Sequence, residues 1–281
     1  MKAEQLKAEK KLEGTYWWFV GRRAILDRVL RRLGKRSRVA VDVGCGSGRN
    51  MQLLLRYSDW VMGFDRSPTA LQLAAAFHGL PLACADGQAI PLADSSADFL
   101  SALDVLEHLE DDMRALNEFH RVLRPEGFLV VTVPAYRFLW SEHDEALMHR
   151  RRYVASELHI KLTCSGFRVL KRSYAVFFAF FPIVLYRLFR GLFPKDPLAP
   201  RASYVKLPAF LNNLLIVLLK IEARMMGAMA FPWGSSIIVL AQKIPELAAR
   251  TQGQLEAVSA GAGEDWLQKL QDNSRMPTLA Q

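Results

Sequence analysis

The stretch VDVGCGSG, residues 41–48, decides how this chain folds. A short apolar strand leads into it and a helical pattern follows, and its glycines let the backbone turn sharply and approach a ligand without Cβ clashes. A dinucleotide-binding turn reads GxGxxG, but here Arg49 stands at the place of the third glycine, and Gly48 comes one residue early. No Walker lysine follows the glycines. The pattern therefore disfavours an NAD site and excludes a P-loop.

Short apolar runs alternate with helical patterns on both sides of this turn, between residues 38 and 173. That alternation predicts βαβ units around a parallel sheet. Pro125 and Gly127, in the sequence RPEG, predict a helix stop and a turn before a strand. We expect strands at 39–43, 60–64, 99–103, 127–133 and 167–173, and helices at 50–57, 68–78 and 111–123.

An acidic residue ends the second of these strands. Asp65 closes the segment VMGFD, about 20 residues beyond the glycine turn, which is where a carboxylate accepts hydrogen bonds from a ribose diol. The alternative role for Asp65 is to cap the helix that begins at Pro68, and Ser67 could provide that cap instead.

Taken in order, these segments resemble the class I S-adenosylmethionine (SAM) methyltransferases. VDVGCGSG resembles the first motif of that family, FD its ribose-binding acid, and ADGQAIPLADSSADF, residues 85–99, its adenine-edge segment. The segments LDVLEHL, residues 103–109, and VLRPEGFLVVTVP, residues 122–134, resemble its fourth-strand and fifth-strand motifs. Five motifs in the family's order make the resemblance specific, although each motif alone would be weak.

The resemblance implies an α/β fold: a Rossmann-like seven-stranded sheet, mostly parallel with an antiparallel last strand, and helices on both faces. FPWGSSIIVLAQK, residues 231–243, resembles the family's seventh strand, which forms a hairpin with the sixth at 167–173. The apolar helical segment 174–232 would then interrupt this hairpin at the sheet edge that carries the cofactor.

The resemblance also implies SAM as the cofactor, and it implies which residues hold it. The segment YWWFVGRR, residues 16–23, resembles N-terminal lids in which an arginine reaches the SAM carboxylate, although an amphipathic helix on the sheet or on lipid is the alternative. The implied contacts are Arg22 to the carboxylate, Asp42 and the backbone of Gly44, Cys45, Gly46 and Gly48 to the methionine moiety, Asp65 to the ribose, Arg66, Asp86 and Gly87 to the adenine, and the backbone of Leu103.

The composition bounds the class of protein. The chain has 281 residues, of which 51% are hydrophobic and 23% charged, which is too apolar for a disordered or fibrous protein. Cys45, Cys84 and Cys164 form no CxxC pair, so we expect no disulfide scaffold and no structural zinc, and a reducing intracellular compartment. The N-terminal MKAEQLKAEKKLEG has no apolar run and does not resemble a secretory signal.

Basic charge flanks a mildly acidic middle. Residues 1–40 hold 12 Lys or Arg against 4 Asp or Glu, and residues 174–232 hold 7 against 2. The second basic region is also apolar, at 174–186 and at 208–219, but neither stretch reaches the about 20 residues that a spanning helix needs. We expect these helices to lie in a membrane interface, attracted by anionic lipid. Buried core helices are the alternative.

These observations divide the chain into five parts. They are an N-terminal helical lid (1–37), a SAM-binding Rossmann-like core (38–173), an apolar basic insert (174–232), the final core strand (233–243) and a mobile C-terminal tail (244–281).

Titratable residues follow the fourth and fifth strands, where an acceptor would bind. His108 and His143 are the candidate general bases, because removing a hydroxyl proton needs a positioned base. We expect no metal, since the spacing of His143, Asp144 and His149 fits no standard zinc pattern. The candidate acceptor-binding residues are Trp140, His143, Arg151, Arg152 and Tyr153.

The sequence thus predicts a SAM-dependent methyltransferase that acts, most readily at oxygen, on a lipid-like, lipid-linked or glycan-type acceptor at an anionic membrane surface. We expect it in the cytoplasm, peripherally attached to the inner membrane. The alternative is a soluble, small-molecule, quinone-like O-methyltransferase whose insert is a substrate lid or dimer interface. A nucleic-acid substrate is disfavoured because no (N/D)PPY-type motif is present, and a non-catalytic membrane scaffold also stays open, as does the oligomeric state.

Overall fold

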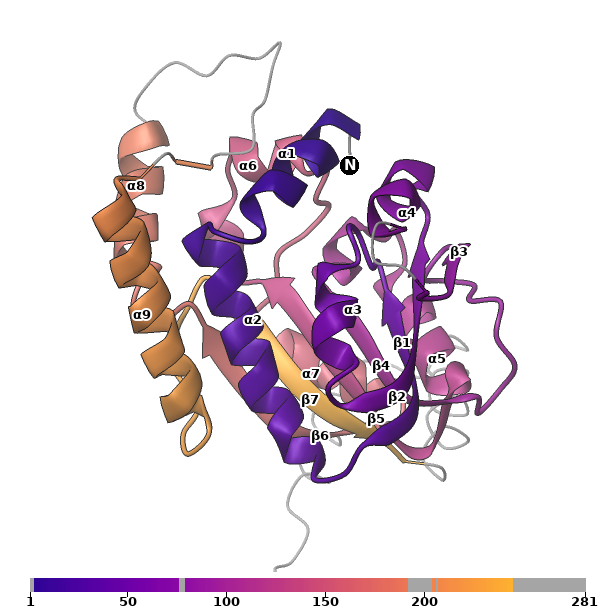
Figure 1. Ribbon diagram of the computed structural model, residues 1–281. Helices are drawn as coiled ribbons and strands as arrows, with labels where there is room; N and C mark the ends of the chain where they lie inside the picture. The colour runs from indigo at the N-terminus through magenta and orange to yellow at the C-terminus, as the bar shows by residue number, and fades with distance from the viewer. Residues whose placement is uncertain (1–2, 76–78, 192–203, 206, 245–281) are drawn as a thin grey trace, which may run out of the picture.

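The computed structural model describes residues 3–75, 79–191, 204–205 and 207–244, and these form a seven-stranded sheet with helices on both faces (Figure 1). The strand order is β3-β2-β1-β4-β5-β7-β6, and β7 runs antiparallel to both of its neighbours while the other pairs are parallel. The strands are β1 Ser37–Val43, β2 Ser58–Asp65, β3 Leu82–Cys84, β4 Ala97–Leu103, β5 Leu123–Pro134, β6 Phe167–Ala175 and β7 Ser236–Lys243. The helices are α1 Ala3–Leu12, α2 Trp17–Leu30, α3 Arg49–Leu54, α4 Pro68–Ala74, α5 Asp112–Val122, α6 Glu142–Ala146, α7 Ala155–Cys164, α8 Phe180–Gly191 and α9 Ala209–Met226.

The predicted sheet, with its antiparallel last strand, is confirmed, and two local expectations are wrong. Strand β3 was not expected from the apolar pattern, because three residues are too few to show a period. Strand β5 begins at Leu123, directly after α5, so RPEG lies within the strand instead of in a turn. Glu126 takes a left-handed φ of 63° there, beside an irregularity in the pairing with β4. The last residues of the predicted helix 68–78 lie outside the described residues.

The sheet is buried on both faces, which is why its strands read as continuous apolar runs. Along β5, Leu129 and Val131 belong to the core that α5 and α7 cover, whereas Val130 belongs to the core that α2, α3 and α9 cover. Helix α5 contributes Leu116 and Phe119 to the first core, and both are fully buried. The two layers of helices leave the carboxyl ends of the parallel strands as the place for a ligand.

Helix α9 is part of the second core, so the segment 174–232 is not wholly a layer added to the surface. Its Leu219 packs against Gly21 of α2, where a Cβ atom would lie 2.6 Å from the Cβ of Leu219. Asn212 of α9 also caps α2, since its side-chain oxygen accepts a hydrogen bond from the backbone N–H of Trp17 at 2.9 Å. Helix α9 therefore holds α2 against the sheet.

Glu222 joins α9 to the connection between β6 and α8. Its side chain is fully buried, and its Oε2 accepts a hydrogen bond from the backbone N–H of Phe177 at 2.8 Å. Its Oε1 has no hydrogen-bond partner in the described part of the chain. Burial raises the pKa of Glu222 to about 7.

We expect the stability of this protein to fall between about pH 5 and pH 7 in part because of Glu222. Its pKa is higher in the folded than in the unfolded chain, so the unfolded chain loses this proton first and the free energy of unfolding decreases as the pH rises. The change is at most about 3 kcal/mol, from 1.36 kcal/mol for each pKa unit. Glu222→Gln should keep the contact with Phe177 and remove this pH-dependent contribution. In urea unfolding, the free energy of unfolding of the variant should therefore rise relative to that of wild type as the pH increases.

The control for this change is Glu110→Gln, because Glu110 is exposed. Parallel stability curves for Glu222→Gln and wild type between pH 5 and pH 8 would contradict the prediction.

Helices α8 and α9, at the left edge of Figure 1, each present large apolar side chains to solvent. Among the described helices, none combines the length and the apolar character that crossing a membrane requires. We call these residues the exposed apolar faces: Phe181, Leu185, Leu188 and Phe189 on α8, and Phe210, Leu214, Val217, Ile221 and Met225 on α9.

Candidate functional site

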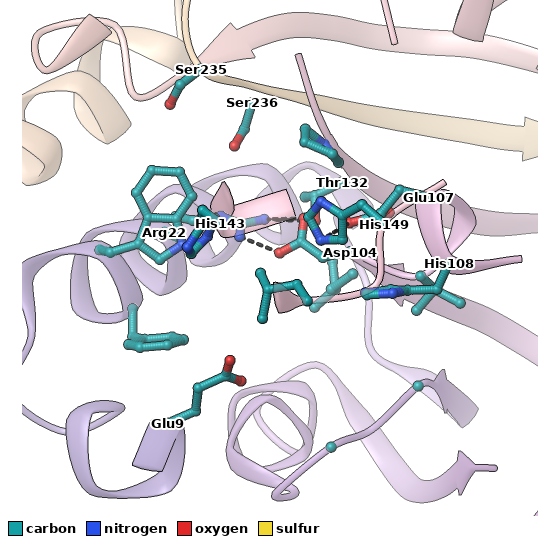
Figure 2. Close-up of a pocket in the computed structure, with 18 of the residues that line it drawn as sticks. Glu9, Arg22, Asp104, Glu107, His108, Thr132, His143, His149, Ser235 and Ser236 are labelled. Carbon is teal, nitrogen blue, oxygen red and sulfur yellow. Dashed lines mark hydrogen bonds and ion pairs between the residues drawn. The ribbon is translucent and has the colours of Figure 1, made fainter. Parts of the chain in front are cut away.

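A cavity of about 1020 Å³ lies where the carboxyl ends of β1, β2, β4 and β5 meet helices α1, α2, α8 and α9. Small-molecule cavities measure about 300–1000 Å³, so this one has room for a cofactor and a second ligand. Polar side chains from the strand ends line one part of it (Figure 2). The helices line the other part with apolar residues, among them Trp17, Phe19, Ile183, Leu211 and Leu215.

The glycine turn between β1 and α3 forms the floor of the polar part of the cavity. Gly44 and Gly46 have φ values of 68° and 56°, in the left-handed region that side chains disfavour. At Gly44 a Cβ atom would also lie 2.5 Å from Cγ2 of Val105, in the loop after β4. Only glycine therefore fits at this position, and the turn exposes backbone to the cavity.

Asp65, at the end of β2, ties the glycine turn to helix α4. Its Oδ2 accepts a hydrogen bond from the Gly46 N–H at 3.0 Å, and its Oδ1 accepts one from the Ser67 N–H at 2.8 Å. Ser67, and not Asp65, caps α4, because its Oγ accepts from the Ala70 N–H at 3.3 Å. The carboxylate thus lies beside the turn at the cavity wall.

Most of the predicted SAM residues reach the cavity. Among the described residues, Asp42, Gly48 and Asp86 do not line it. Asp42 is buried in β1 and accepts a hydrogen bond from the Ser101 hydroxyl at 2.6 Å, and burial raises its pKa to about 7. The residues that do line it are Arg22, Gly44, Cys45, Gly46, Asp65, Arg66, Gly87 and Leu103.

Arg22 of α2 forms a half-buried ion pair with Asp104, the residue after β4 (Figure 2). The guanidinium donates two hydrogen bonds to the Asp104 carboxylate and one to the Thr132 hydroxyl, the last at 2.8 Å. Burial opposes both charges, but the pairing outweighs it: the pKa of Arg22 is raised and that of Asp104 is lowered. The cavity wall therefore contains a fixed charge pair beside the strand end.

A second group of polar residues, which we call the acid–histidine cluster, consists of Glu107, His108, Asp144 and His149. The His149 Nδ1 lies 2.8 Å from Asp144 Oδ1, and the rings of His108 and His149 meet edge to face at 4.8 Å. Burial, and then the charge of Asp104, raise the pKa of Glu107 well above its usual value. Burial also lowers the pKa of His108 to about 4.

His143, the second candidate base, lies in the cavity wall. Its ring meets that of Tyr204 edge to face at 5.8 Å. Burial and then the nearby Arg187 lower its pKa to about 4, so the ring is neutral at pH 7. The Asp144 carboxylate, next to His143 in the chain, bonds His149 and Arg152.

The predicted acceptor-binding residues divide into two groups. Trp140, His143 and Arg152 line the cavity, and Arg152 does so within a buried ion pair with Asp144. Arg151 and Tyr153 do not line it. The Tyr153 hydroxyl is fully buried and donates to Asp112 at 2.8 Å, and Arg151 donates to carbonyls after η2, Leu106–His108, so both hold the fold together instead.

Several cavity residues were not among the predicted ones. Glu13, between α1 and α2, accepts a hydrogen bond from the Ser47 hydroxyl at 2.6 Å and so connects the N-terminal helices to the glycine turn. Arg187 of α8 lies 3.6 Å from Asp144. Its signal in the sequence is a single basic residue directly after 13 uncharged ones, at 174–186.

Part of this chain is similar in sequence to known methyltransferases. A family model described as "Methyltransferase domain" matches residues 41–131. A protein of Mycolicibacterium smegmatis described as a probable S-adenosylmethionine-dependent methyltransferase is 29% identical over 156 residues, which are 54% of this chain and 60% of that protein. The O-methyltransferase cnsE of Penicillium expansum is 32% identical over 118 residues, 37% of this chain and 43% of its own. This chain thus spans 60% or less of these relatives.

Solved structures share the fold. The methyltransferase in complex with the Trm112 activator of Haloferax volcanii has a TM-score of 0.56 at 19% identity, over 85% of this chain and 94% of its own. The [4+2]-cyclase SpnF has a TM-score of 0.51 at 21% identity, over 78% and 80%. At these identities the likeness concerns the fold alone.

A doubly wound sheet whose ligand cavity lies at the turn after its first strand defines the Rossmann-like class of nucleoside-binding proteins. The matched family segment contains that turn, the acid after β2 and the loop after β4. Residues 41–131 thus match the methyltransferase domain, and the chain is similar to SAM-dependent methyltransferases of class I, whose methyl donor is SAM.

Proposed function

We propose that this protein transfers the methyl group of SAM to an oxygen atom of an apolar, lipid-linked acceptor, with α8 and α9 resting on an anionic membrane. One observation carries the proposal: the two helices that expose apolar faces also line the cavity. Ile183 and Arg187 of α8, and Leu211 and Leu215 of α9, face the cavity. An apolar acceptor held between these helices would pass from lipid to the cavity without crossing water.

The residues at the strand ends fit the cofactor side of this reaction. When bound, SAM supplies a methyl group on a positively charged sulfur, which an acceptor oxygen takes up by in-line displacement. The turn at Gly44 and Gly46 presents backbone to the cavity, and Asp65 presents a carboxylate where a ribose diol would lie. Leu103 and Gly87 line the same wall. Arg22, although paired with Asp104, also lines this wall, and its positive charge would attract the carboxylate of SAM.

The acceptor side needs a group that takes up the hydroxyl proton. His108 and His143 both line the cavity, and both rings are neutral at pH 7 because burial lowers their pKa to about 4. A neutral imidazole has a nitrogen lone pair that can accept this proton. Transfer to oxygen is also the activity in the name of the cnsE relative.

The exposed apolar faces fit the membrane part of the proposal. Phe210 is 74% exposed and Leu188 67%, and side chains of this kind bury themselves at the headgroup boundary. Lys220 and Arg224 are exposed on α9 next to that face. Each basic residue near an anionic surface contributes about 1 kcal/mol of attraction.

Flotation with lipid vesicles tests the membrane part. We expect the full chain to float with vesicles that contain phosphatidylglycerol and to float less with pure phosphatidylcholine. Phe210→Gln, Leu214→Gln and Val217→Gln combined should reduce flotation at least about tenfold, because three apolar side chains leave the lipid. Binding of S-adenosylhomocysteine should stay unchanged. The matched control is Trp60→Gln, which removes an exposed apolar residue, 68% exposed, from β2.

Two outcomes would contradict this proposal. If wild-type protein does not float with the vesicles, the proposed binding to a membrane is wrong. If the wild type is a dimer and the triple variant is a monomer, the exposed apolar faces pair two copies of the chain, which favours the small-molecule alternative.

A separate experiment tests the acceptor: methyl-labelled SAM is added to membrane extracts with the protein. We expect the label in the organic phase and in its alkali-stable ether fraction. Label in the aqueous phase alone would overturn the lipid acceptor.

A further inference from the structure

Three side chains of the acid–histidine cluster are arranged as metal ligands usually are. Glu107, His108 and His149 each offer a ligand atom, and these atoms lie within 4.8 Å of one another. Glu107 is fully buried, yet neither of its carboxylate oxygens has a hydrogen-bond partner in the described part of the chain. A buried carboxylate without a partner is costly, so its presence here needs an explanation.

The orientation of His149 supplies a second, independent observation. Its Nδ1 lies 2.8 Å from Asp144 Oδ1, which favours the proton on Nδ1 and leaves the lone pair on Nε2. Asp144 is itself held by the buried Arg152, whose Nε donates to it at 2.8 Å. A carboxylate that orients a histidine from behind is the usual second shell of a metal-bound imidazole.

The distance across the cluster suits an intervening ion. The His149 Nε2 lies 4.0 Å from Glu107 Oε1, which is too long for a hydrogen bond. Two bonds of about 2.0–2.2 Å to one ion would span at most about 4.4 Å. Three atoms within 4.8 Å of one another lie at most about 2.8 Å from a common centre, so each would move inward by about half an ångström to reach these bond lengths.

The fold holds the two ligand segments together. The backbone N–H of Arg150 donates to the carbonyl of Glu107 at 2.7 Å, so the loop after β4 and the segment after α6 are joined next to the ligands. Figure 2 shows Glu107, His108 and His149 on the side of the cavity that lies away from Glu9. Asp104 lies nearby but is paired with Arg22 and Thr132.

The geometry points to a site for a divalent transition-metal ion, bound by Glu107, His108 and His149 and open toward the cavity. Two imidazoles and one carboxylate are a donor set that Zn²⁺ and related first-row ions prefer, and three protein ligands leave a position for another oxygen. The spacing of His143, Asp144 and His149 in the sequence could not reveal this site, because only His149 among them is one of the three proposed ligands.

The role of the ion rests on the proposed function. An acceptor oxygen in the open position would lose its proton more readily, because a bound cation stabilises the oxygen anion that then attacks the methyl group. With the ion bound, the lone pair of His108 is used as a ligand, so the proton goes to His143 or to water instead, and the sulfonium becomes a neutral thioether as the carbon–sulfur bond breaks. Binding of the ion itself depends on none of these steps.

Metal titration of the full chain tests the site. After dialysis against a chelator, we expect wild-type protein to bind one Co²⁺, with visible absorption bands that Zn²⁺ displaces. Glu107→Gln and His149→Gln should each weaken binding at least about 100-fold, and Asp144→Asn about 10- to 100-fold through the orientation of His149. His159→Gln, which removes an imidazole of α7 outside the cavity, is the matched control and should bind as wild type does.

Each outcome decides a different claim. Absence of a Co²⁺ spectrum in wild-type protein, or equal affinity in all variants, would overturn the site. Zn²⁺ should also raise the melting temperature of wild type and of His159→Gln but not that of Glu107→Gln, so a poorly folded variant is recognised by its own melting curve. If wild-type protein does not bind S-adenosylhomocysteine, the proposed function is wrong, but the proposed metal site is unaffected. Methyl transfer that a chelator does not slow would overturn the acceptor role alone.

Discussion

Asp65→Ala should weaken the binding of S-adenosylhomocysteine at least about 100-fold. The Asp65 carboxylate accepts hydrogen bonds from the backbone N–H groups of Gly46 and Ser67, and so it holds the glycine turn in place. In the proposed complex it also faces the ribose hydroxyls. Hydrogen bonds to a charged group contribute about 1.5–3 kcal/mol each, and every 1.4 kcal/mol is a factor of about ten in affinity. Isothermal titration calorimetry measures the change.

Asp59→Ala is the matched control, because Asp59 lies at the other end of the same strand in an exposed ion pair with Arg36. It should bind the ligand as wild type does. Equal affinities for Asp65→Ala and Asp59→Ala would show that the nucleoside binds elsewhere. They would also overturn the assignment of the cavity wall at the glycine turn to the cofactor.

Gly21→Ala should destabilise the protein by about 1–3 kcal/mol, although alanine is the better helix former by about 1 kcal/mol. Gly21 lies in the middle of α2, and an added Cβ would lie 2.6 Å from the Cβ of Leu219 on α9. Because the close atom is a Cβ and not the end of a flexible side chain, rotation of Leu219 does not relieve the clash. Chemical denaturation measures the free energy of unfolding.

A double-mutant cycle makes this prediction specific. Leu219→Ala alone should cost about 2–5 kcal/mol, since it leaves a cavity in a buried site. Together with Gly21→Ala it should cost less than the sum, because the truncation removes Cγ and Cδ1 of Leu219, which would also clash with the new methyl group, and leaves only the Cβ contact. Leu214→Ala, on the exposed face of α9, is the control and should change stability little. A stabilised Gly21→Ala would show that α2 and α9 are not in close contact.

The sheet could be predicted from short windows of sequence. Apolar runs such as 39–43 and 236–242 match β1 and β7 to within a few residues, because burial on both faces demands apolar side chains in sequence order. The glycine turn was also visible, since positive φ values and close packing select glycine locally. Strand β3 was missed because three residues carry no period.

The candidate site was only partly visible. Asp65 and the glycines are neighbours of predicted strand ends, so the general rule for ligand sites in parallel sheets reaches them. Arg22 and Asp104 come from segments about 80 residues apart. Their pairing follows from how α2 crosses the strand ends, and no local pattern encodes that crossing. Tyr153 shows the opposite error: a polar residue after a strand was assigned to the acceptor, but it bonds Asp112 within the core.

The order of residues was enough to predict the Rossmann-like sheet, the glycine turn that lines the cavity and the apolar character of the segment 174–232, because each of these depends on neighbours in the chain. Tertiary structure decided which face of α9 is buried against Gly21 and which is exposed, and it brought Glu107 and His108 to His149. Those contacts join distant segments, whose relative placement results from packing the whole core and not from any local preference.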